Sequence, residues 1–419
     1  MIKRDCVIIG GGSAAMSCAI SAAKYGVKDI LIIERNEDLG GILNQCIHNG
    51  FGLQIFKKEC SGPEYAELLM KSMKKYHIDV KLETTVTNLT EDKRVTYVNQ
   101  KEGVVEIQAK AVVLASGCLE RSRGMISIPG SRCNNVLSAG TAQRYLNIDG
   151  YMVGKKVFIL GSGDIGLIMA RRMTLEGAKV LGVAEIMPYS NGLSRNIVQC
   201  LDDFEIPLYL STTVTKIIGS NKIEKIELSK VDENLQPIAG SEWTVDVDCL
   251  LLSIGLIPEI TLLDKLNVER DSRTKSVKVN ECNEMSLPGF FACGNALQVH
   301  DLVDYVSMEA ENCGKQVARY LENEIVEAEG YDVIHGFHVS YVVPQKIRLA
   351  NIDSDCKFSF RVTKPMKNCI LRIKTEDKIL KEVKKRIMLP AEMETINLEK
   401  SMLSEVHQSL IFEVEENVW

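Results

Sequence analysis

Short apolar runs and helical patterns alternate along the first third of the chain. Residues 5–9 and 30–34 are apolar runs of strand length, and residues 13–25 between them have the spacing of an apolar helix. This order predicts a βαβ unit, with both strands in a parallel sheet that is buried on both faces. Residues 61–76 predict a second helix, because a proline stands near its start. Residues 80–108 alternate apolar and polar positions, which predicts a β-meander.

The same order of elements begins again half-way along the chain. A strand over 157–160, a helix over 164–176 and a strand over 180–185 predict a second βαβ unit. The other shared segments are a meander, at 210–230 and 243–248 in the second copy, and a closing apolar strand before a glycine turn, at 111–117 and 250–255. The chain therefore contains two copies of one architecture rather than a short solenoid repeat.

The pattern changes in the last third of the chain. Residues 288–295 predict a strand that ends in a glycine turn, and residues 304–324 predict a long amphipathic helix. Beyond Gly330 most segments alternate, and one helix is predicted over 376–386. Residues 331–419 therefore predict a small, mostly β C-terminal domain.

Two glycine-rich loops stand where the first strand of each copy meets its helix. They read Gly10-Gly11-Gly12-Ser13-Ala14-Ala15 and Gly161-Ser162-Gly163-Asp164-Ile165-Gly166. In such a loop the first glycine makes a tight turn, the second lets the backbone approach a pyrophosphate, and a small third residue lets helix and strand pack. The pyrophosphate lies at the helix N-terminus, where N–H groups and the helix dipole favour an anion.

Each loop is followed by a glutamate at the end of the next strand. Glu34 stands 34 − 10 = 24 positions after Gly10, and Glu185 stands 185 − 161 = 24 positions after Gly161. An acidic residue about 20 positions beyond the loop accepts the ribose hydroxyls of a dinucleotide. One such loop can be a mere turn, but two loops with matching acids predict two bound dinucleotides, the arrangement that a hydride relay needs.

The composition is that of a soluble globular protein with more than one domain. The chain has 419 residues, of which 45% are apolar and 25% charged, and its net charge is −6. The length predicts two or three domains, and the negative charge argues against a nucleic-acid partner. No apolar run reaches the roughly 18 residues of a membrane span. The first strand begins too early to leave room for a signal peptide.

The 13 cysteines are scattered, and no two of them have C-x-x-C spacing. This argues against a thioredoxin-type motif, a zinc ribbon and the usual iron–sulfur ligand sets. We expect free thiols in a reducing cytoplasm, most of them small buried apolar residues. His335-x-x-His338 has a spacing found in metal sites, but no third ligand is apparent, so no metal site is predicted.

Residues 1–325 resemble the two-dinucleotide-domain FAD- and pyridine nucleotide-dependent oxidoreductases, the pyridine nucleotide-disulfide oxidoreductase-like family. The resemblance rests on the two loops, on the turns at 114–117 and 255–258, and on Pro288-Gly289-Phe290-Phe291-Ala292-Cys293-Gly294-Asn295. It implies an α/β fold with two Rossmann-like domains of three-layer ββα type and the small β-rich domain. The implied domains are an FAD domain over 1–118 and 255–328, an NAD(P)H domain over 119–254 and a C-terminal domain over 331–419.

The resemblance also implies where each cofactor binds. The Gly294-Asn295 turn would contact the FAD ribityl chain, and the helix after it would direct its dipole at the flavin ring. The family usually has Asp where this chain has Asn295, which hydrogen-bonds without a charge. The implied FAD residues are Gly10, Gly12, Ser13, Ala14, Ala15, Glu34, Arg35, Gly41, Gln45, Val86, Ala115, Ser116, Gly117, Gly294 and Asn295. The implied NAD residues are Gly161, Gly163, Asp164, Ile165, Gly166, Glu185 and Gly255.

Two segments, residues 40–52 and 299–304, resemble a narrower group. They are similar to the flavoprotein partner of FAD-dependent glycerol-3-phosphate dehydrogenase-like proteins, and to subunits of hydrogen cyanide synthase and opine oxidase. This match would cover nearly the whole chain. It implies that the flavin exchanges electrons with a second flavoprotein dehydrogenase subunit.

Cys46, His48 and His300 are candidate catalytic residues, because their segments are expected near the flavin. Disulfide reductases have a cysteine pair after the Gly-Gly turn, but here no second cysteine appears before Cys60. A single-thiol mechanism would need a lowered pKa at Cys46, and the alternative is a packing residue in the flavin pocket. The two histidines either exchange protons with the flavin or are structural.

Glu185 bears on the choice between NADH and NADPH. A carboxylate there accepts the 2′-hydroxyl of NADH and repels a 2′-phosphate. Arg171 and Arg172 lie in the preceding helix and are not placed to compensate, whereas Arg195 stays open as a phosphate partner. We therefore expect FAD and NADH, with NADPH as the weaker alternative.

The predicted activity is hydride transfer between NADH and FAD, with electrons passed to or from a partner subunit. Two alternatives stay open. One is a stand-alone NADH-dependent peroxide or disulfide reductase that uses Cys46. The other is a non-catalytic assembly subunit whose dinucleotides are structural.

Overall fold

The computed structural model describes residues 2–416 of the chain. The chain divides into two compact units. The first contains the residues up to Cys118 together with those from Pro258 onward, and the second is Leu119–Ile257. The short strands β9 (Cys118–Glu120) and β18 (Leu256–Pro258) lie where the chain passes from one unit to the other.

The first unit is built on a sheet with the strand order β5-β2-β1-β8-β7-β6, in which β21 also pairs with β8. Strands β1, β2, β5 and β21 run parallel to their neighbours, whereas β6 and β7 are antiparallel. The strands are β1 (Ile2–Ile9), β2 (Ile30–Ile33), β5 (Ile78–Lys81), β6 (Thr85–Leu89), β7 (Arg94–Asn99), β8 (Gly103–Leu114) and β21 (Phe290–Ala292).

Successive residues of β1 face two different cores. Cys6 and Ile8 pack with residues of helices α1 (Ser13–Lys24), α2 (Gly62–Met73) and α6 (Val303–Leu321). Val7 and Ile9 pack on the other face with the β6–β7 meander and with residues between 260 and 297. Because side chains alternate along a strand, an uninterrupted apolar run supplies both faces of the sheet.

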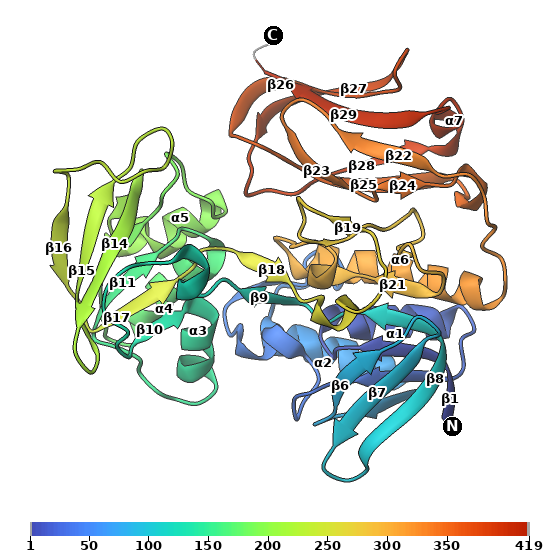
Figure 1. Cartoon of the computed structure of the whole chain (residues 1–419), viewed down its shortest axis with the longest axis horizontal. Coiled ribbons are helices and arrows are strands. Elements are labelled where there is room, and N and C mark those ends of the chain that lie inside the picture. The colour runs from blue at the N-terminus through green and yellow to red at the C-terminus, as the bar shows by residue number, and fades with distance from the viewer. Residues whose placement is uncertain (1, 417–419) are drawn as a thin grey trace. The chain divides into compact units, whose positions relative to one another are not determined.

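Strand β8 differs from its prediction. The sequence pattern placed the end of a meander near residue 108 and a separate strand over 111–117, whereas one strand runs over Gly103–Leu114 (Figure 1). Its first half pairs antiparallel with β7 and its second half parallel with β1. Two successive partners satisfy the backbone without a break, which local alternation does not reveal.

The second unit repeats the plan on a parallel sheet with the order β10-β17-β11-β12-β13. Its strands are β10 (Val136–Ser138), β11 (Lys156–Leu160), β12 (Lys179–Ala184), β13 (Leu208–Tyr209) and β17 (Cys249–Leu252). Helices α3 (Ala139–Asn147), α4 (Asp164–Leu175) and α5 (Ser194–Cys200) and an antiparallel meander of β14 (Thr212–Gly219), β15 (Ile223–Lys230) and β16 (Trp243–Asp246) complete it.

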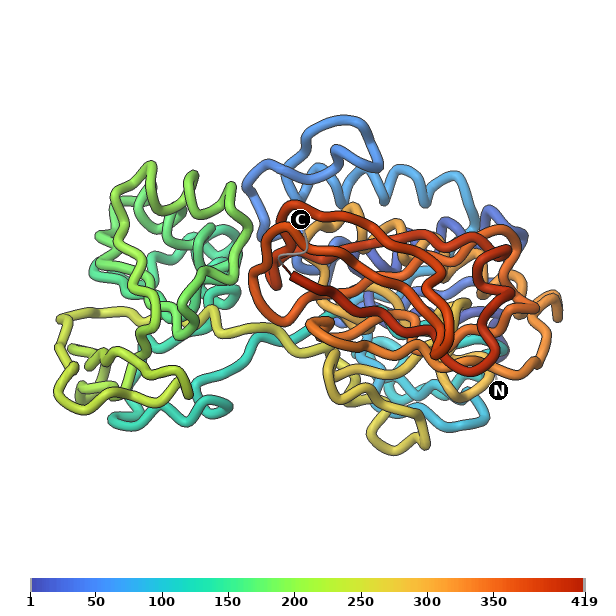
Figure 2. The backbone as a smooth tube through the Cα atoms, turned by 90° about the horizontal axis from the view of Figure 1, so that it is seen from above, coloured from blue at the N-terminus to red at the C-terminus, as the bar shows by residue number. Residues whose placement is uncertain are grey.

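The C-terminal part of the first unit consists of two sheets, β24-β22-β29-β26-β27 and β23-β25-β28, around a core of its own. Their strands are β22 (Tyr331–His335), β23 (Val339–Val343), β24 (Lys346–Ile347), β25 (Asp355–Val362), β26 (Met366–Lys374), β27 (Ile379–Met388), β28 (Glu394–Glu399) and β29 (Ser409–Glu415). Both views show these strands, orange to red, over the rest of this unit (Figures 1 and 2).

The helix predicted over 376–386 is wrong. This segment contributes most of β27, which pairs antiparallel with β26 at the edge of its sheet. Its Lys and Glu residues are typical both of a solvated helix and of an edge strand, where charges discourage further pairing. The hydrogen bonds offered by β26 decide between the two. The one α-helix described between residues 331 and 416 is α7 (Lys400–Leu403).

Candidate dinucleotide-binding sites

The first glycine loop leaves β1 under tight steric constraint. Gly10 has φ +108°, and a Cβ on it would lie 2.4 Å from the carbonyl oxygen of Ala115. A Cβ on Gly12, in contrast, would meet nothing within 4 Å. The loop is thus closed toward the sheet at Gly10 and open at Gly12, which suits the approach of a pyrophosphate.

Helix α1 presents an uncapped N-terminus to this loop. Its N-cap is Gly12, with no side-chain hydrogen bond, and its first turn holds no acidic residue. Ser13, Ala14 and Ala15 are buried there. Small side chains, free N–H groups and the positive end of the dipole fit the phosphates of a dinucleotide.

Glu34 holds the first loop in place. The side chain is 5% exposed, Oε2 accepts a hydrogen bond from the Gly11 N–H (2.6 Å), and Oε1 accepts one from the Asn36 N–H (2.7 Å). The carboxylate therefore shapes the loop before any ribose reaches it. Each oxygen keeps a further lone pair, so the predicted ribose contact stays a prediction.

Two other predicted FAD segments lie near this loop. The Gly40 N–H donates to the Gly11 carbonyl (2.9 Å), and a Cβ on Gly41 would lie 3.2 Å from Gly12 Cα. A Cβ on Gly294 would lie 2.6 Å from the Ala14 Cβ. Segments 40–41 and 294–295 are thus brought against the loop. Arg35 is exposed directly after Glu34.

The remaining predicted FAD residues have definite places. Ser116 Oγ donates to the Glu259 carbonyl (2.5 Å), and the Glu259 N–H donates to the Gly117 carbonyl (2.9 Å). Val86 lies on β6, two residues after Thr84, whose N–H donates to the Glu34 carbonyl (2.9 Å). Gln45 ends the short helix Gly41–Gln45.

A half-buried carboxylate also supports the Gly294-Asn295 turn. Glu309 on α6 accepts from the Gly294 N–H through Oε1 (2.7 Å) and from Gln298 Nε2 through Oε2 (2.6 Å). Sequence reasoning missed Glu309, because one carboxylate on an amphipathic helix looks like an ordinary surface residue.

His300 lies inside this network, with 2% of its side chain exposed. Its Nδ1 is 3.3 Å from Asn295 Oδ1, and its Nε2 is 3.3 Å from Glu309 Oε2. Its backbone N–H also donates to Asn295 Oδ1 (3.0 Å). Both ring nitrogens thus face oxygen atoms that can accept a hydrogen bond.

The C-terminal strands anchor the residues that follow His300. Arg361 on β25 forms an ion pair with Asp301 and donates to the Val299 carbonyl (3.0 Å). Asp301 Oδ2 also accepts from the Met393 N–H (2.6 Å). Asp304, 2% exposed, accepts from the Gly52 and Ile55 N–H groups, both at 3.0 Å. The sequence analysis did not identify Arg361. Asp304, in contrast, lies in residues 299–304, one of the segments on which the narrower resemblance rests.

Cys46 and His48 lie between the Gly41–Gln45 helix and α2. The Cys46 carbonyl accepts from the Gly62 N–H (2.8 Å), and the His48 ring lies 5.0 Å from that of Phe51. Burial raises the pKa of the Cys46 thiol to about 12. A thiol in this state is a poor nucleophile at neutral pH, because the thiolate is the reactive form.

The second loop, in the other unit, repeats the first. Gly161 has φ +96°, and a Cβ on it would lie 2.0 Å from the Ser253 carbonyl oxygen. Glu185, 4% exposed, accepts from the Ser162 N–H (3.0 Å) and Ser162 Oγ (2.6 Å) through Oε2, and from the Met187 N–H (3.0 Å) through Oε1.

The start of α4 also fits a phosphate group. Gly163 is its N-cap, and the Gly166 N–H donates to Ser253 Oγ (3.0 Å). Asp164 Oδ1 accepts hydrogen bonds from the Leu193 N–H (2.9 Å) and from Asn196 Nδ2 (2.6 Å). These protein donors solvate the carboxylate. Ile165 packs against the core of this unit, and the Gly255 carbonyl accepts from the Arg121 N–H (3.0 Å).

A family model decides the class to which these sites belong. The model described as pyridine nucleotide-disulphide oxidoreductase matches residues 4–317. The chain belongs to this family. The predicted resemblance to the pyridine nucleotide-disulfide oxidoreductases is therefore confirmed. The C-terminal strands, which begin at Tyr331, lie beyond the matched residues.

Two curated proteins that resemble this chain have low sequence identity to it. The hydrogen cyanide synthase protein HcnB of Pseudomonas aeruginosa, a subunit of that enzyme, is 24% identical over 66% of this chain and 62% of that protein. An alkyl hydroperoxide reductase subunit of Staphylococcus epidermidis is 26% identical over 73% of this chain and 56% of that protein. The chain therefore spans less than two thirds of the length of each.

Solved structures confirm the fold. Thioredoxin reductase of T. acidophilum has a TM-score of 0.62 at 21% identity and covers 78% of this chain and 100% of its own. Bacillithiol disulfide reductase of Bacillus cereus has a TM-score of 0.61 at 18% identity, over 77% and 100%. The predicted α/β class with a β-rich C-terminal region is correct. No helix described here is long and apolar enough to cross a membrane.

Alkylation of Cys46 tests whether its thiol is reactive. With a pKa of about 12, the native thiol at pH 8 holds about a thousand-fold less thiolate than the unfolded chain, whose cysteine pKa is about 8.5. We expect iodoacetamide to label Cys46 far more slowly in the native protein than in urea, measured by peptide mass mapping. The native rate should climb with each pH unit as the pH approaches the raised pKa. Equal native and unfolded rates at pH 8 would contradict this account.

Proposed function

We propose that the chain transfers hydride between NADH and FAD and passes electrons to or from a second flavoprotein subunit. The observation that carries the proposal is the duplicated site: two glycine loops, each held by a buried glutamate through backbone N–H groups. Hydride transfer needs orientation rather than a side-chain nucleophile, so pre-shaped loops supply the main protein contribution.

The first loop is proposed as the FAD site. Glu309, His300 and Asn295 form one half-buried hydrogen-bonded group beside Gly294, which itself packs on Ala14 of α1. FAD, when bound, accepts or donates a hydride at its flavin ring. The chain's part is to hold the ribityl segment with Asn295 and to keep a polar, exchangeable proton at His300.

The second loop is proposed as the NADH site. Glu185 places a buried carboxylate beside the predicted ribose position, and its charge disfavours a 2′-phosphate. Arg195 is exposed on α5, and no hydrogen bond to Glu185 is described for it. These features support NADH over NADPH.

The proposed electron exchange with a partner protein rests on the sequence, which has no C-x-x-C pair and no second cysteine between Cys46 and Cys60 for dithiol chemistry. The raised pKa of Cys46 also weighs against the alternative of a single-cysteine peroxide or disulfide reductase. Both relatives named above are described as subunits of larger enzymes. A glycerol-3-phosphate dehydrogenase-like flavoprotein is the partner that the sequence resemblance favours.

Anaerobic mixing with NADH tests the hydride step. The purified protein should lose its flavin absorption at about 450 nm. A Gly163→Asp variant should slow this at least about a hundredfold, because the new carboxylate repels the pyrophosphate and its Cβ would lie 3.2 Å from Ser253 Oγ. Asn234→Asp, which adds the same charge at an exposed position of the same unit, should react normally. The proposal would be refuted if the flavin of the wild-type protein stayed oxidised after mixing with NADH.

Replacement of Glu185 tests the cofactor choice separately. Glu185→Ala should lower the ratio of kcat/KM for NADH to that for NADPH by about tenfold, because one charged hydrogen bond to the 2′-hydroxyl is lost. Ser162→Ala serves as the control, since it removes a donor to Glu185 but keeps the carboxylate. It should weaken both cofactors alike. An unchanged ratio in Glu185→Ala would show that the carboxylate does not select NADH.

Copurification tests the partner. A tagged full-length chain, captured from the cells that produce it, should bring with it a second protein with its own flavin, identified by mass spectrometry and by more than one flavin per chain. A chain that purifies alone and turns over NADH at full rate with a peroxide or small disulfide would instead support the stand-alone reductase.

A further inference from the structure

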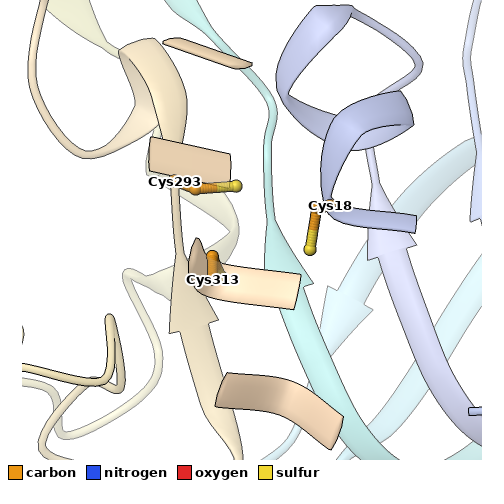
Figure 3. Close-up of side chains that lie close together, drawn as sticks. All are labelled: Cys18, Cys293 and Cys313. Atoms are coloured by element: carbon orange, nitrogen blue, oxygen red, sulfur yellow. The ribbon is translucent and has the colours of Figure 1, made fainter. Parts of the chain in front are cut away.

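Three cysteines far apart in the sequence converge in the core of the first unit. Cys18 lies on α1, Cys293 directly follows β21, and Cys313 lies on α6. Their Sγ atoms all lie within 4.8 Å of one another, and each residue is fully buried. Figure 3 shows Cys18 on one side of the group and Cys293 and Cys313 on the other. Spacing along the chain gave no hint of this cluster.

We propose that Cys18, Cys293 and Cys313 form a binding site for one thiophilic cation, best matched by Cu(I). Thiolates are the ligands that select soft ions such as Cu(I) and Zn(II). An ion at the centre of three sulfurs, with metal–sulfur distances of about 2.3 Å, requires sulfur–sulfur distances of about 4.0 Å. The observed limit of 4.8 Å accommodates that triangle with a small inward movement of the side chains.

The number of ligands favours Cu(I) over Zn(II). No fourth histidine, cysteine or carboxylate joins the group within residues 2–416. Structural Zn(II) takes four ligands in a tetrahedron, whereas Cu(I) is stable with three sulfurs in a plane. The burial of the group also leaves no exposed position for a water ligand. Each thiol that binds as thiolate releases one proton, so the affinity should fall as the pH is lowered.

The ion would join three segments that build the first dinucleotide site. Helix α1 begins at the glycine loop, Cys293 precedes the Gly294-Asn295 turn, and α6 carries Glu309. Helices α1 and α6 are already in close contact, since a Cβ on Gly314 would lie 2.2 Å from the Cys18 carbonyl oxygen. An enclosed ion of this kind is taken up as the domain folds, because metal binding and folding are coupled. The proposal does not depend on the redox function.

Refolding with Cu(I) tests the site. The full chain is unfolded and refolded anaerobically, with reductant and FAD, in the presence of Cu(I) buffered by a competing Cu(I) chelator. We expect one copper per chain after desalting, an ultraviolet thiolate-to-copper absorption, and three sulfur neighbours at about 2.3 Å by X-ray absorption. The thermal midpoint should rise by about 5 °C relative to protein refolded without metal.

Two variants separate this site from the other thiols. Cys313→Ala should lower copper retention at least tenfold, whereas Cys60→Ala, which removes another buried thiol of the same core, should keep it. Wild-type protein that retains no copper against the chelator would overturn the proposal, as would equal losses in both variants. Should Cys313→Ala fail to refold, the X-ray absorption of the wild type decides alone. Nitrogen or oxygen neighbours in place of three sulfurs would exclude the site.

Discussion

A buried carboxylate that accepts backbone N–H groups is the interaction on which both sites depend. Glu34 and Glu185 occupy the same place in the two units, at the end of the second strand, and each binds the second residue of its glycine loop and the residue two positions after itself. Hydrogen bonds to a charged group contribute about 1.5–3 kcal/mol each. One bond holds the glycine-rich turn, whose backbone would otherwise be free to change conformation, and the other fixes the carboxylate at the end of its strand.

The first site is assembled from segments that are distant in sequence. Glu309 accepts a hydrogen bond from the Gly294 N–H, and the His300 ring lies between Asn295 and the same carboxylate. The C-terminal strands hold the next residues, because Arg361 pairs with Asp301. The C-terminal region therefore belongs to the structure that positions the site. Its removal would leave Asp301, which is nearly buried, without its counter-charge, a costly change in a protein interior.

In the proposed function, the protein contributes orientation and electrostatics. Neutral Asn295 stands where the family usually has Asp, and a histidine with two acceptors lies directly behind it. The Cys46 thiol, with its raised pKa, is poorly suited to replace the dithiol of disulfide reductases. Family membership and the two glycine loops support the flavin and nicotinamide chemistry proposed above.

The sequence by itself determined the duplicated plan. The two loops, the two glutamates at equal spacing and the apolar strands are local signals, since each depends on residues within a single βαβ unit. Tertiary structure decided the rest. The charged segment that forms most of β27 is a strand because it pairs with β26. Strand β8 is continuous because it pairs with β7 along its first half and with β1 along its second half. The contacts of Glu309, Arg361 and the three clustered cysteines join residues far apart in the chain, and no local period records which distant residues folding brings together.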